Sequence, residues 1–159
     1  MTDPAPPNGW RDWEEVMRLA LDEAKRAGDV NEVPVGAVIL DPDGEVLAKA
    51  SNSPISRNDP TSHAEILALR QACKKLNNYR LPGCILVVTL EPCLMCLGAL
   101  VHARVETVVY GAADPKTGAV TSRLEGFALP FLNHRPAVIH GVLEEECGAL
   151  LRDFFRSRR

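Results

Sequence analysis

The chain has 159 residues, of which 46% are hydrophobic and 25% are charged, and this composition supplies enough apolar residues for the core of one ordinary domain. No stretch approaches the roughly 20 uncharged apolar residues that a membrane-spanning helix needs, so we expect no membrane partner. The net charge of -3 argues against broad, charge-driven binding to nucleic acid, although a local basic patch could still hold an RNA.

The first nine residues differ in composition from the rest of the chain. Residues 1–9 are rich in proline and contain no basic residue, so they lack the basic start of a secretory signal and the arginines of a transit peptide. We expect 1–9 to form a flexible tail and 10–159 to form a single domain of a cytoplasmic protein. The five cysteines, an odd number in a chain of this length, indicate no disulfide framework.

The first half of the chain alternates between helical and strand periodicity. The expected elements are a helix over 12–27, strands over 33–40 and 45–51, and a helix that runs to Lys75. Gly28 is a candidate C-cap for the first helix, and the last helix opens at Asp59-Pro60 or at Ser62. Residues 52–60 have the composition of a loop.

The second half begins with a break at Leu81-Pro82-Gly83. The expected elements are a strand over 84–90, a helix from Pro92 to 103, a strand over 105–110, a short helix around 122–128, a strand over 137–142 and a helix over 144–156. Strands that alternate with helices predict an α/β fold in three layers, with a mixed sheet covered by helices on both faces.

Two segments carry the candidate chemistry, Thr61–Glu65 and Glu91–Cys96. Cys93 and Cys96 lie three positions apart, so a helix would place both thiolates on one face. Pro92 at the first helical position would fix the entry, and the helix N-terminus favours negatively charged sulfur. A redox C-x-x-C would fit the same spacing, so the cysteine pair alone leaves two alternatives open.

His63 offers a third ligand immediately before a predicted helix. Three protein ligands leave the fourth tetrahedral position for water, which is typical of a catalytic zinc and not of a structural one. Zinc lowers the pKa of a bound water from about 16 to about 7, which makes hydroxide available at neutral pH. The sequence therefore predicts one Zn2+ per subunit, held by His63, Cys93 and Cys96.

Glu65 has two interpretations. Ser62 and Glu65 match a capping box, and residues two apart, such as His63 and Glu65, do not share a helix face. Both observations argue against a catalytic Glu65, but they do so less strongly if His63 lies in a distorted first turn of the helix. The pattern H-x-E followed by P-C-x-x-C is the signature of zinc-dependent nucleobase deaminases, in which the Glu moves protons and does not bind the metal. We therefore predict that Glu65 is the catalytic proton shuttle.

The segments that flank this signature indicate a narrower family. From residue 12 onward the chain resembles the bacterial tRNA-specific adenosine deaminases of the cytidine deaminase superfamily. The segments that carry the resemblance are Glu32–Val38, Asn52, Asp59–Glu65, Thr89–Cys93, Gly111–Gly118, Leu132–Arg135 and Phe154–Arg159. The resemblance implies a cytidine deaminase-like fold with a five-stranded sheet between helices. It also implies a homodimer that converts adenosine to inosine at the wobble position of a tRNA anticodon loop.

The resemblance further implies that Asn52 hydrogen-bonds the flipped base and that Asp114 touches the RNA backbone. The other expected substrate contacts are the backbone N–H of Ala64, the pocket wall at Val33 and Pro34, and the RNA-facing residues Asn133 and Phe155. Alone, Asn52 would more often be a turn residue than a ligand. Of the adjacent Phe154 and Phe155, we expect one to pack and one to stack on a base.

Several other polar residues leave alternatives open. The arginines at the end of the chain, Arg152, Arg156, Arg158 and Arg159, either complement the helix dipole or form a local patch for RNA. His102, His134 and His140 are further possible ligands, but none has a spacing that competes with the motif. His140 is expected to be structural, and His134 to face RNA.

The principal rival function is a zinc deaminase of a free base or nucleoside, such as guanine or cytosine. Such an enzyme would share the zinc, Glu65 and the fold, but it would have less need of the loop over 114–118 or of the arginine tail. A non-catalytic zinc-binding or RNA-binding module is disfavoured, because three ligands leave a coordination position open and Glu65 lies beside them.

Overall fold

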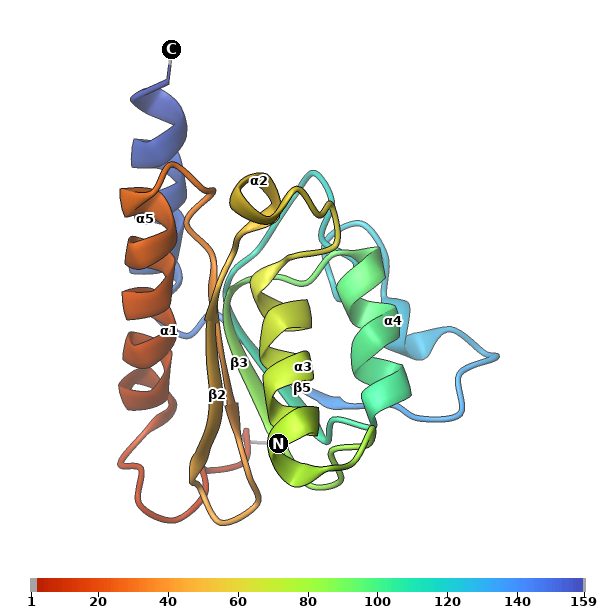
Figure 1. The fold of residues 1–159 in the computed structure, drawn as a ribbon. Helices are drawn as coiled ribbons and strands as arrows, with labels where there is room; N and C mark the ends of the chain where they lie inside the picture. Colours follow the sequence, from red (N-terminus) through yellow and green to blue (C-terminus); the bar gives the residue numbers. More distant parts are fainter. Residues whose placement is uncertain (1–2, 159) are drawn as a thin grey trace.

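The computed structural model describes residues 3–158 as a mixed sheet of five strands between two layers of helices (Figure 1). The strands are β1 (Gly36–Leu40), β2 (Val46–Ser51), β3 (Ile85–Leu90), β4 (Thr107–Ala112) and β5 (Ala137–His140). The helices are α1 (Trp13–Asp29), α2 (Pro54–Arg57), α3 (Ala64–Leu76), α4 (Leu94–Ala103) and α5 (Glu144–Arg156), with a 3-10 turn, η1 (Gly126–Ala128). This architecture confirms the predicted three-layer α/β fold.

The strand order across the sheet is β2-β1-β3-β4-β5. β1 is antiparallel to both of its neighbours, whereas β3, β4 and β5 are parallel to one another. Parallel strands end at the same edge of a sheet, and the helices that follow them begin there. Accordingly, α3 and α4 both begin at the upper edge in Figure 1, the edge at which α1 and α5 end.

Two apolar clusters fill the space on either side of the sheet. α1 and α5 cover one face and α3 and α4 cover the other, so the central strands are buried on both faces. The complete burial of β1 agrees with its continuous apolar run. At Gly36 the helix lies so close that a Cβ atom would be 2.0 Å from the carbonyl oxygen of Ala20, so this position of β1 accepts only glycine.

The expected element bounds differ from the structure mainly at the upper edge of the sheet. α1 continues through Gly28, so the prediction of a C-cap there is wrong; the cap is Val30, followed by Asn31 in the left-handed region at φ 65°. The predicted strand over 33–40 begins only at Gly36. Its first residues form a tight turn in which the Val35 amide donates to the Val33 carbonyl.

Three further differences concern loops. The segment 52–60, predicted as loop, contains the short helix α2, and the helix predicted around 122–128 is only η1. Pro92 precedes the N-cap of α4, which is Cys93, so the prediction of Pro92 at the first helical position is wrong. Strand β4 lies two residues later than predicted, β5 begins at the predicted residue 137 but ends at 140, and α5 has the predicted bounds, 144–156.

The N-terminal segment contacts the β1–β2 hairpin. Trp13 donates its indole N–H to the Pro4 carbonyl at 2.8 Å, and Trp10 donates to the Gly44 carbonyl at 2.7 Å. Met1 and Thr2 of the predicted tail, and Arg159 of the predicted basic end, lie outside the described residues. Among residues 3–158, no helix combines the length and the apolar character that crossing a membrane requires.

Candidate metal centre and active site

A histidine and two cysteines converge where α3 and α4 begin. Nδ1 of His63 lies 3.6 Å from Sγ of Cys93 and 3.6 Å from Sγ of Cys96. The three ligand atoms lie within 4.8 Å of one another, and within the described residues they form the one such group of three or more His, Cys, Asp or Glu side chains. The structure therefore brings together the three residues that the motif singled out.

The donor set and its spacing fit a metal ion. Ligand atoms that surround a zinc ion tetrahedrally at about 2.0–2.3 Å lie about 3.6 Å from one another, which is the separation of Nδ1 from each sulfur. Imidazole nitrogen and thiolate sulfur are ligands that bind zinc well, whereas calcium and magnesium prefer oxygen ligands. The group can thus hold a zinc-like ion with one coordination position open.

Two helix N-termini position these ligands. His63 is the N-cap of α3 and Cys93 is the N-cap of α4, and no described side chain caps either helix. The exposed amides of a first helical turn carry partial positive charge, which favours an anionic ligand such as a thiolate. Cys96 lies within the first turn of α4 and is buried, so both sulfurs belong to the same helix end.

Hydrogen bonds within the group shift the pKa values of its three side chains. A hydrogen bond with Cys96 lowers the pKa of Cys93 to about 4, and the same bond raises the pKa of Cys96. A hydrogen bond with Cys93 raises the pKa of His63 above its ordinary value. Cys93 is therefore the first of the two thiols to ionise, and it does so beside the imidazole.

Glu65 lies in the first turn of α3, beside the metal group. Its side chain is 4% exposed, and burial raises the pKa of its carboxyl. The alternative interpretation as a capping box is wrong, because the N-cap is His63 and the Ser62 hydroxyl donates instead to Asp59 at 2.7 Å. Glu65 is thus a buried carboxyl next to a candidate metal, which is the arrangement of a general acid and base.

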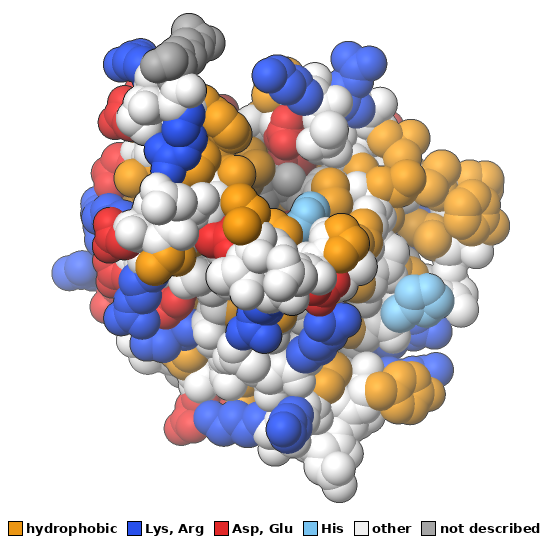
Figure 2. Space-filling model, turned by 45° about the horizontal axis from the view of Figure 1, so that its top comes forward, with side chains coloured by type: hydrophobic (Ala, Val, Ile, Leu, Met, Phe, Trp, Pro, Cys, Tyr) orange, Lys and Arg blue, Asp and Glu red, His pale blue; other side chains and the backbone are white. Residues whose placement is uncertain are grey.

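A groove of about 740 Å³ lies at this end of the sheet, between the segment that follows β4 and the end of α5. It brings together three predicted contact residues, Val33, Asp114 and Phe155. Phe155 is 51% exposed, whereas Phe154 is partly buried, packs edge-on against it and lies beneath the Arg158 guanidinium. Figure 2 faces this end of the molecule, where hydrophobic side chains gather around a depression and Lys and Arg side chains lie on its rim.

Asn52 and Pro34 are buried, and neither of these predicted contact residues lines the groove. Asn52 is buried and donates from its side-chain amide to the Val33 carbonyl at 3.2 Å, which leaves the amide oxygen as the group that can accept from a ligand. Pro34 is buried against α1, where its Cβ lies near Gly28. The two residues therefore fix the backbone at Val33, which lines the groove.

The Asp114 carboxylate stabilises its own loop by hydrogen bonds. Its carboxylate accepts hydrogen bonds from the amides of Lys116 and Thr117 and from the Thr117 hydroxyl, at 2.9, 3.1 and 2.9 Å. Such bonds shape the exposed turn over 114–117. The backbone and side chains of this turn, more than the carboxylate alone, form the surface on that side of the groove.

Other predicted residues lie apart from the group. Asn133 is exposed, and its neighbour His134, predicted to face RNA, is in hydrogen-bonding contact with the carbonyl of Val105, just before β4 begins and therefore at the opposite end of the sheet. His140 stacks on Tyr110. Several terminal arginines have partners: Arg152 pairs with Glu145, Arg156 with Asp153 and Arg158 with Asn31.

Sequence reasoning missed three carboxylates that hold the loops around the site. Asp59 accepts bonds from the residues just before His63, and Glu32 accepts from the first amides of α2. Glu91 accepts from the segment after β4. For Glu32 and Glu91 the available signal was an acidic residue beside an apolar run, since a buried carboxylate must be paired, whereas Asp59 lies in a polar loop and carried no such signal.

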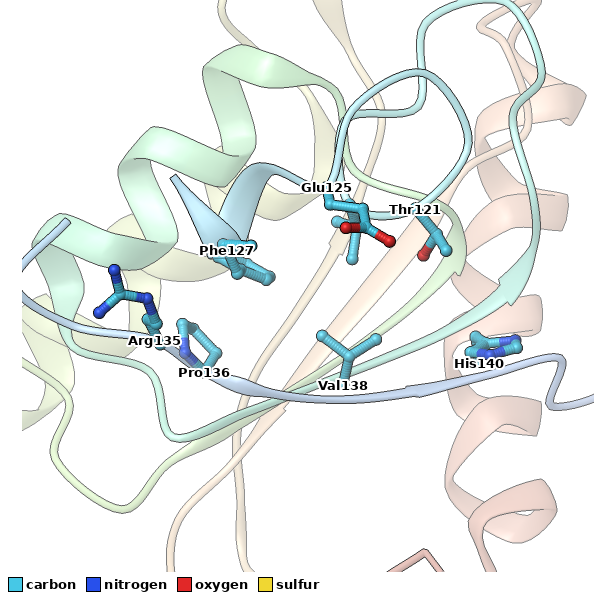
Figure 3. Close-up of a pocket in the computed structure, with 9 residues that line it drawn as sticks. Thr121, Glu125, Phe127, Arg135, Pro136, Val138 and His140 are labelled. Atoms are coloured by element: carbon cyan, nitrogen blue, oxygen red, sulfur yellow. The ribbon is translucent and has the colours of Figure 1, made fainter. Parts of the chain in front are cut away.

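A second hollow lies beside β5 and away from the metal group (Figure 3). Its volume is about 520 Å³, and its lining includes Thr121, Glu125, Phe127, Arg135 and His140. Figure 3 shows Val138 and His140 of β5 on one side of this space and Thr121 and Glu125 on the other. No member of the metal group lines it.

Comparisons with known proteins agree with this geometry. A family model described as MafB19-like deaminase matches residues 11–159. The tRNA-specific adenosine deaminase of Agrobacterium fabrum is 49% identical over 143 residues, which cover 90% of this chain and 93% of that protein. A solved structure from work on A-to-I editing by tRNA deaminases at the wobble position has a TM-score of 0.84 at 47% identity, with 86% of this chain and 99% of that chain covered.

The guanine deaminase of Nitrosomonas europaea is a more distant structural relative. Its TM-score is 0.73 at 25% identity, with 95% of this chain and 86% of that chain covered. Deaminases of different substrates therefore share this fold, and the substrate must be argued from the site.

Asp59 generates a prediction about stability and pH. Hydrogen bonds from Ser62 and Thr61 lower the pKa of Asp59 from 3.8 to about 2, so its ionised form stabilises the fold at any pH above 3.8. This contribution disappears as the pH falls from 3.8 through about 2. Urea denaturation of the metal-free protein from pH 6 to pH 3 should show Asp59→Asn less stable at pH 6, with the difference shrinking toward pH 3. The exposed Asp22→Asn is the control, and a difference for Asp59→Asn that does not vary with pH would contradict the assignment.

Proposed function

This chain belongs to the MafB19-like deaminase family, together with the curated tRNA-specific adenosine deaminases, and we propose that it converts adenosine to inosine at the wobble position of a tRNA anticodon loop. The observation that carries the proposal is the convergence of His63, Cys93 and Cys96 beside the buried Glu65. The groove at the same edge of the sheet, which no member of the metal group lines, has room for a nucleotide and its neighbours.

In the proposed mechanism, His63, Cys93 and Cys96 hold one zinc ion per subunit. When bound, zinc supplies a water whose pKa is close to neutral. Glu65 takes one proton from the attacking water and delivers it to a ring nitrogen of adenine. It then takes the second proton from the new hydroxyl at C6 and delivers it to the amino group, which leaves as ammonia. The raised pKa of Glu65 suits this work, because the carboxyl must both accept and release protons near neutral pH. In this mechanism the backbone N–H of Ala64, the first residue of α3, holds the oxygen.

The substrate side of the proposal uses the groove. A base stacked inside a duplex cannot reach a recessed metal, so the target is an unstacked loop nucleotide. The amide oxygen of Asn52 accepts from the flipped base, while Val33 and the backbone held by Pro34 form a wall. Phe155, exposed at the groove, is the aromatic that can stack on a neighbouring base. The turn at Asp114 contacts the RNA backbone.

The rival substrate is a free base, and the guanine deaminase fold supports it only at the level of architecture. Two observations favour RNA. The tRNA-specific relative is 49% identical over 90% of this chain, whereas a guanine deaminase of Bacillus subtilis is 42% identical but covers only 63% of this chain, and that of Nitrosomonas europaea is 25% identical. The groove extends beyond what a single base needs, along the turn over 114–117 and the end of α5. Because tRNA is the proposed substrate, the proposed location is the cytoplasm.

We further propose that residues 10–159 act as one deaminase domain in a homodimer. The apolar side chains of Leu94 and Met95 on α4, and of Leu124 and Phe131 in the segment that packs against α4, are exposed. Phe131 has 78% of its surface exposed. Exposed apolar groups on two neighbouring elements are typical of an interface. Asn133 lies in the same segment, where a partner subunit could bring it to the RNA.

A substrate panel tests the proposed function. The zinc-loaded enzyme is incubated with an anticodon stem-loop bearing adenosine at the wobble position, with the same stem-loop bearing guanosine there, and with free guanine, cytosine, adenine and adenosine. We expect ammonia and inosine only from the first RNA. Efficient ammonia release from guanine or cytosine, with the adenosine RNA inert, would replace the proposed substrate by the rival.

Glu65→Ala tests the proton shuttle. We expect kcat on the adenosine stem-loop to fall by about 100-fold or more, while one zinc per chain remains bound, because Glu65 moves protons and does not ligate the metal. Metal content by atomic absorption and inosine by chromatography are measured on the same sample. Glu125→Ala, in the hollow beside β5, is the control. Turnover within tenfold of the unchanged enzyme would remove Glu65 from the mechanism.

The oligomeric state tests the homodimer. The chain has a mass of 17.4 kDa, so light scattering at micromolar concentration should give twice this value. Phe131→Glu should shift the protein toward monomer, because a charge would be buried at the proposed interface. Tyr79→Glu, at an exposed tyrosine far along the chain, should leave the mass unchanged. A fully active monomer would contradict this part of the proposal.

A further inference from the structure

Glu91 is a buried carboxylate that the proposed chemistry does not use. It lies between the end of β3 and Cys93, and it is only 2% exposed. Its backbone amide donates to the Ala112 carbonyl at the end of β4, at 2.9 Å. A buried charge persists only where hydrogen bonds or an opposite charge compensate it, so the partners of Glu91 show what the side chain holds.

All five described donors to the Glu91 carboxylate come from the segment that follows β4. One oxygen accepts from the Asp114 amide at 3.0 Å and from the Ser122 hydroxyl. The other accepts from the amides of Val120, Thr121 and Ser122 at 3.1, 2.8 and 2.9 Å. Hydrogen bonds to a charged acceptor are roughly twice as strong as neutral ones, so this cluster is a strong local anchor.

The segment over 114–122 has open space on two sides. Its first part, 114–117, lines the groove of the proposed site, and Val120 and Thr121 line the hollow beside β5 (Figure 3). Between these spaces Ala119 and Val120 pack into the apolar core, and the segment wraps closely around the carboxylate. At Gly118 a Cβ atom would lie 2.4 Å from Cδ of Glu91, so no other residue fits without displacing the segment.

We propose that Glu91 is a positioning residue that fixes the turn over 114–117 relative to the metal group and thereby sets the affinity for the RNA substrate. The inference rests on the proposed function, since it concerns the groove that holds the RNA. Glu91 lies two residues before Cys93, so one short segment carries both a metal ligand and the anchor of the RNA-facing turn. A shift of that turn changes RNA binding without moving His63 or Glu65, which belong to a different helix.

The test is Glu91→Gln. Glutamine has the same size, but it places an NH2 donor where a carboxylate oxygen accepted, so at least the Asp114 amide loses its acceptor and the Ser122 hydroxyl must turn to accept from the new NH2 group. We expect KM for the anticodon stem-loop to rise about tenfold, as the loss of one or two hydrogen bonds would produce. We expect kcat to stay within about threefold and the zinc content to stay at one per chain. Amide hydrogen exchange over 114–122 should become faster, while exchange in α4 stays unchanged.

Two further variants make the test specific. Ser122→Ala removes only the hydroxyl bond and should move KM and exchange in the same direction by a smaller amount, which keeps the inference testable if Glu91→Gln does not fold. Glu23→Gln is the matched control, since Glu23 is also buried but its carboxylate accepts from Ser51 and pairs with Arg26 on the α1 side. It should leave KM and the exchange of 114–122 unchanged.

The outcomes separate this inference from the proposed function. If the unchanged enzyme deaminates the stem-loop but KM and exchange are the same in Glu91→Gln and Ser122→Ala, the positioning role is overturned. A loss of zinc together with a fall in kcat would also overturn it, because Glu91 would then serve the metal ligands. If the unchanged enzyme deaminates no RNA, the proposed function fails, and the exchange of 114–122 still decides whether Glu91 holds the turn.

Discussion

The structure depends on two helices that begin side by side at one edge of a single sheet. His63 and Cys93 are the N-caps of α3 and α4, and Cys96 follows one turn later, so three ligand atoms from distant parts of the chain meet within 4.8 Å. The parallel pairing of β3 and β4 and the antiparallel pairing of β1 fix where those helices begin. The sheet thus brings both helix ends to one edge, and the loop before His63 completes the placement of the three ligand atoms.

Much of this arrangement could be predicted from the sequence. Long apolar runs such as the one through β1 identified the central strands, and charge at the two ends of 144–156 identified α5. The ligands could be predicted because their spacing is local: Cys93 and Cys96 share one helix end, and the signature adds His63. Chemistry that depends on a few adjacent residues is visible in a sequence.

The parts that could not be predicted depend on acidic side chains whose partners only the folded chain defines. Glu32, more than 20 positions before α2, accepts from the amides of Ile55 and Ser56, and backbone amides leave no trace in residue identity. The capping box at Ser62 does not form, because its hydroxyl donates to Asp59, three positions earlier. Boundaries and loops are therefore less predictable than ligands.

The bonds around Glu91 differ from most polar networks, because four of the five donors are backbone amides and only Ser122 contributes a side chain. A scaffold of this kind tolerates diversification. The outward side chains of the turn, such as Pro115 and Lys116, can be varied in a library while the main-chain bonds that shape the turn persist. Selection for altered nucleic-acid preference could thus begin at these positions, with Gly118 and Ser122 held constant.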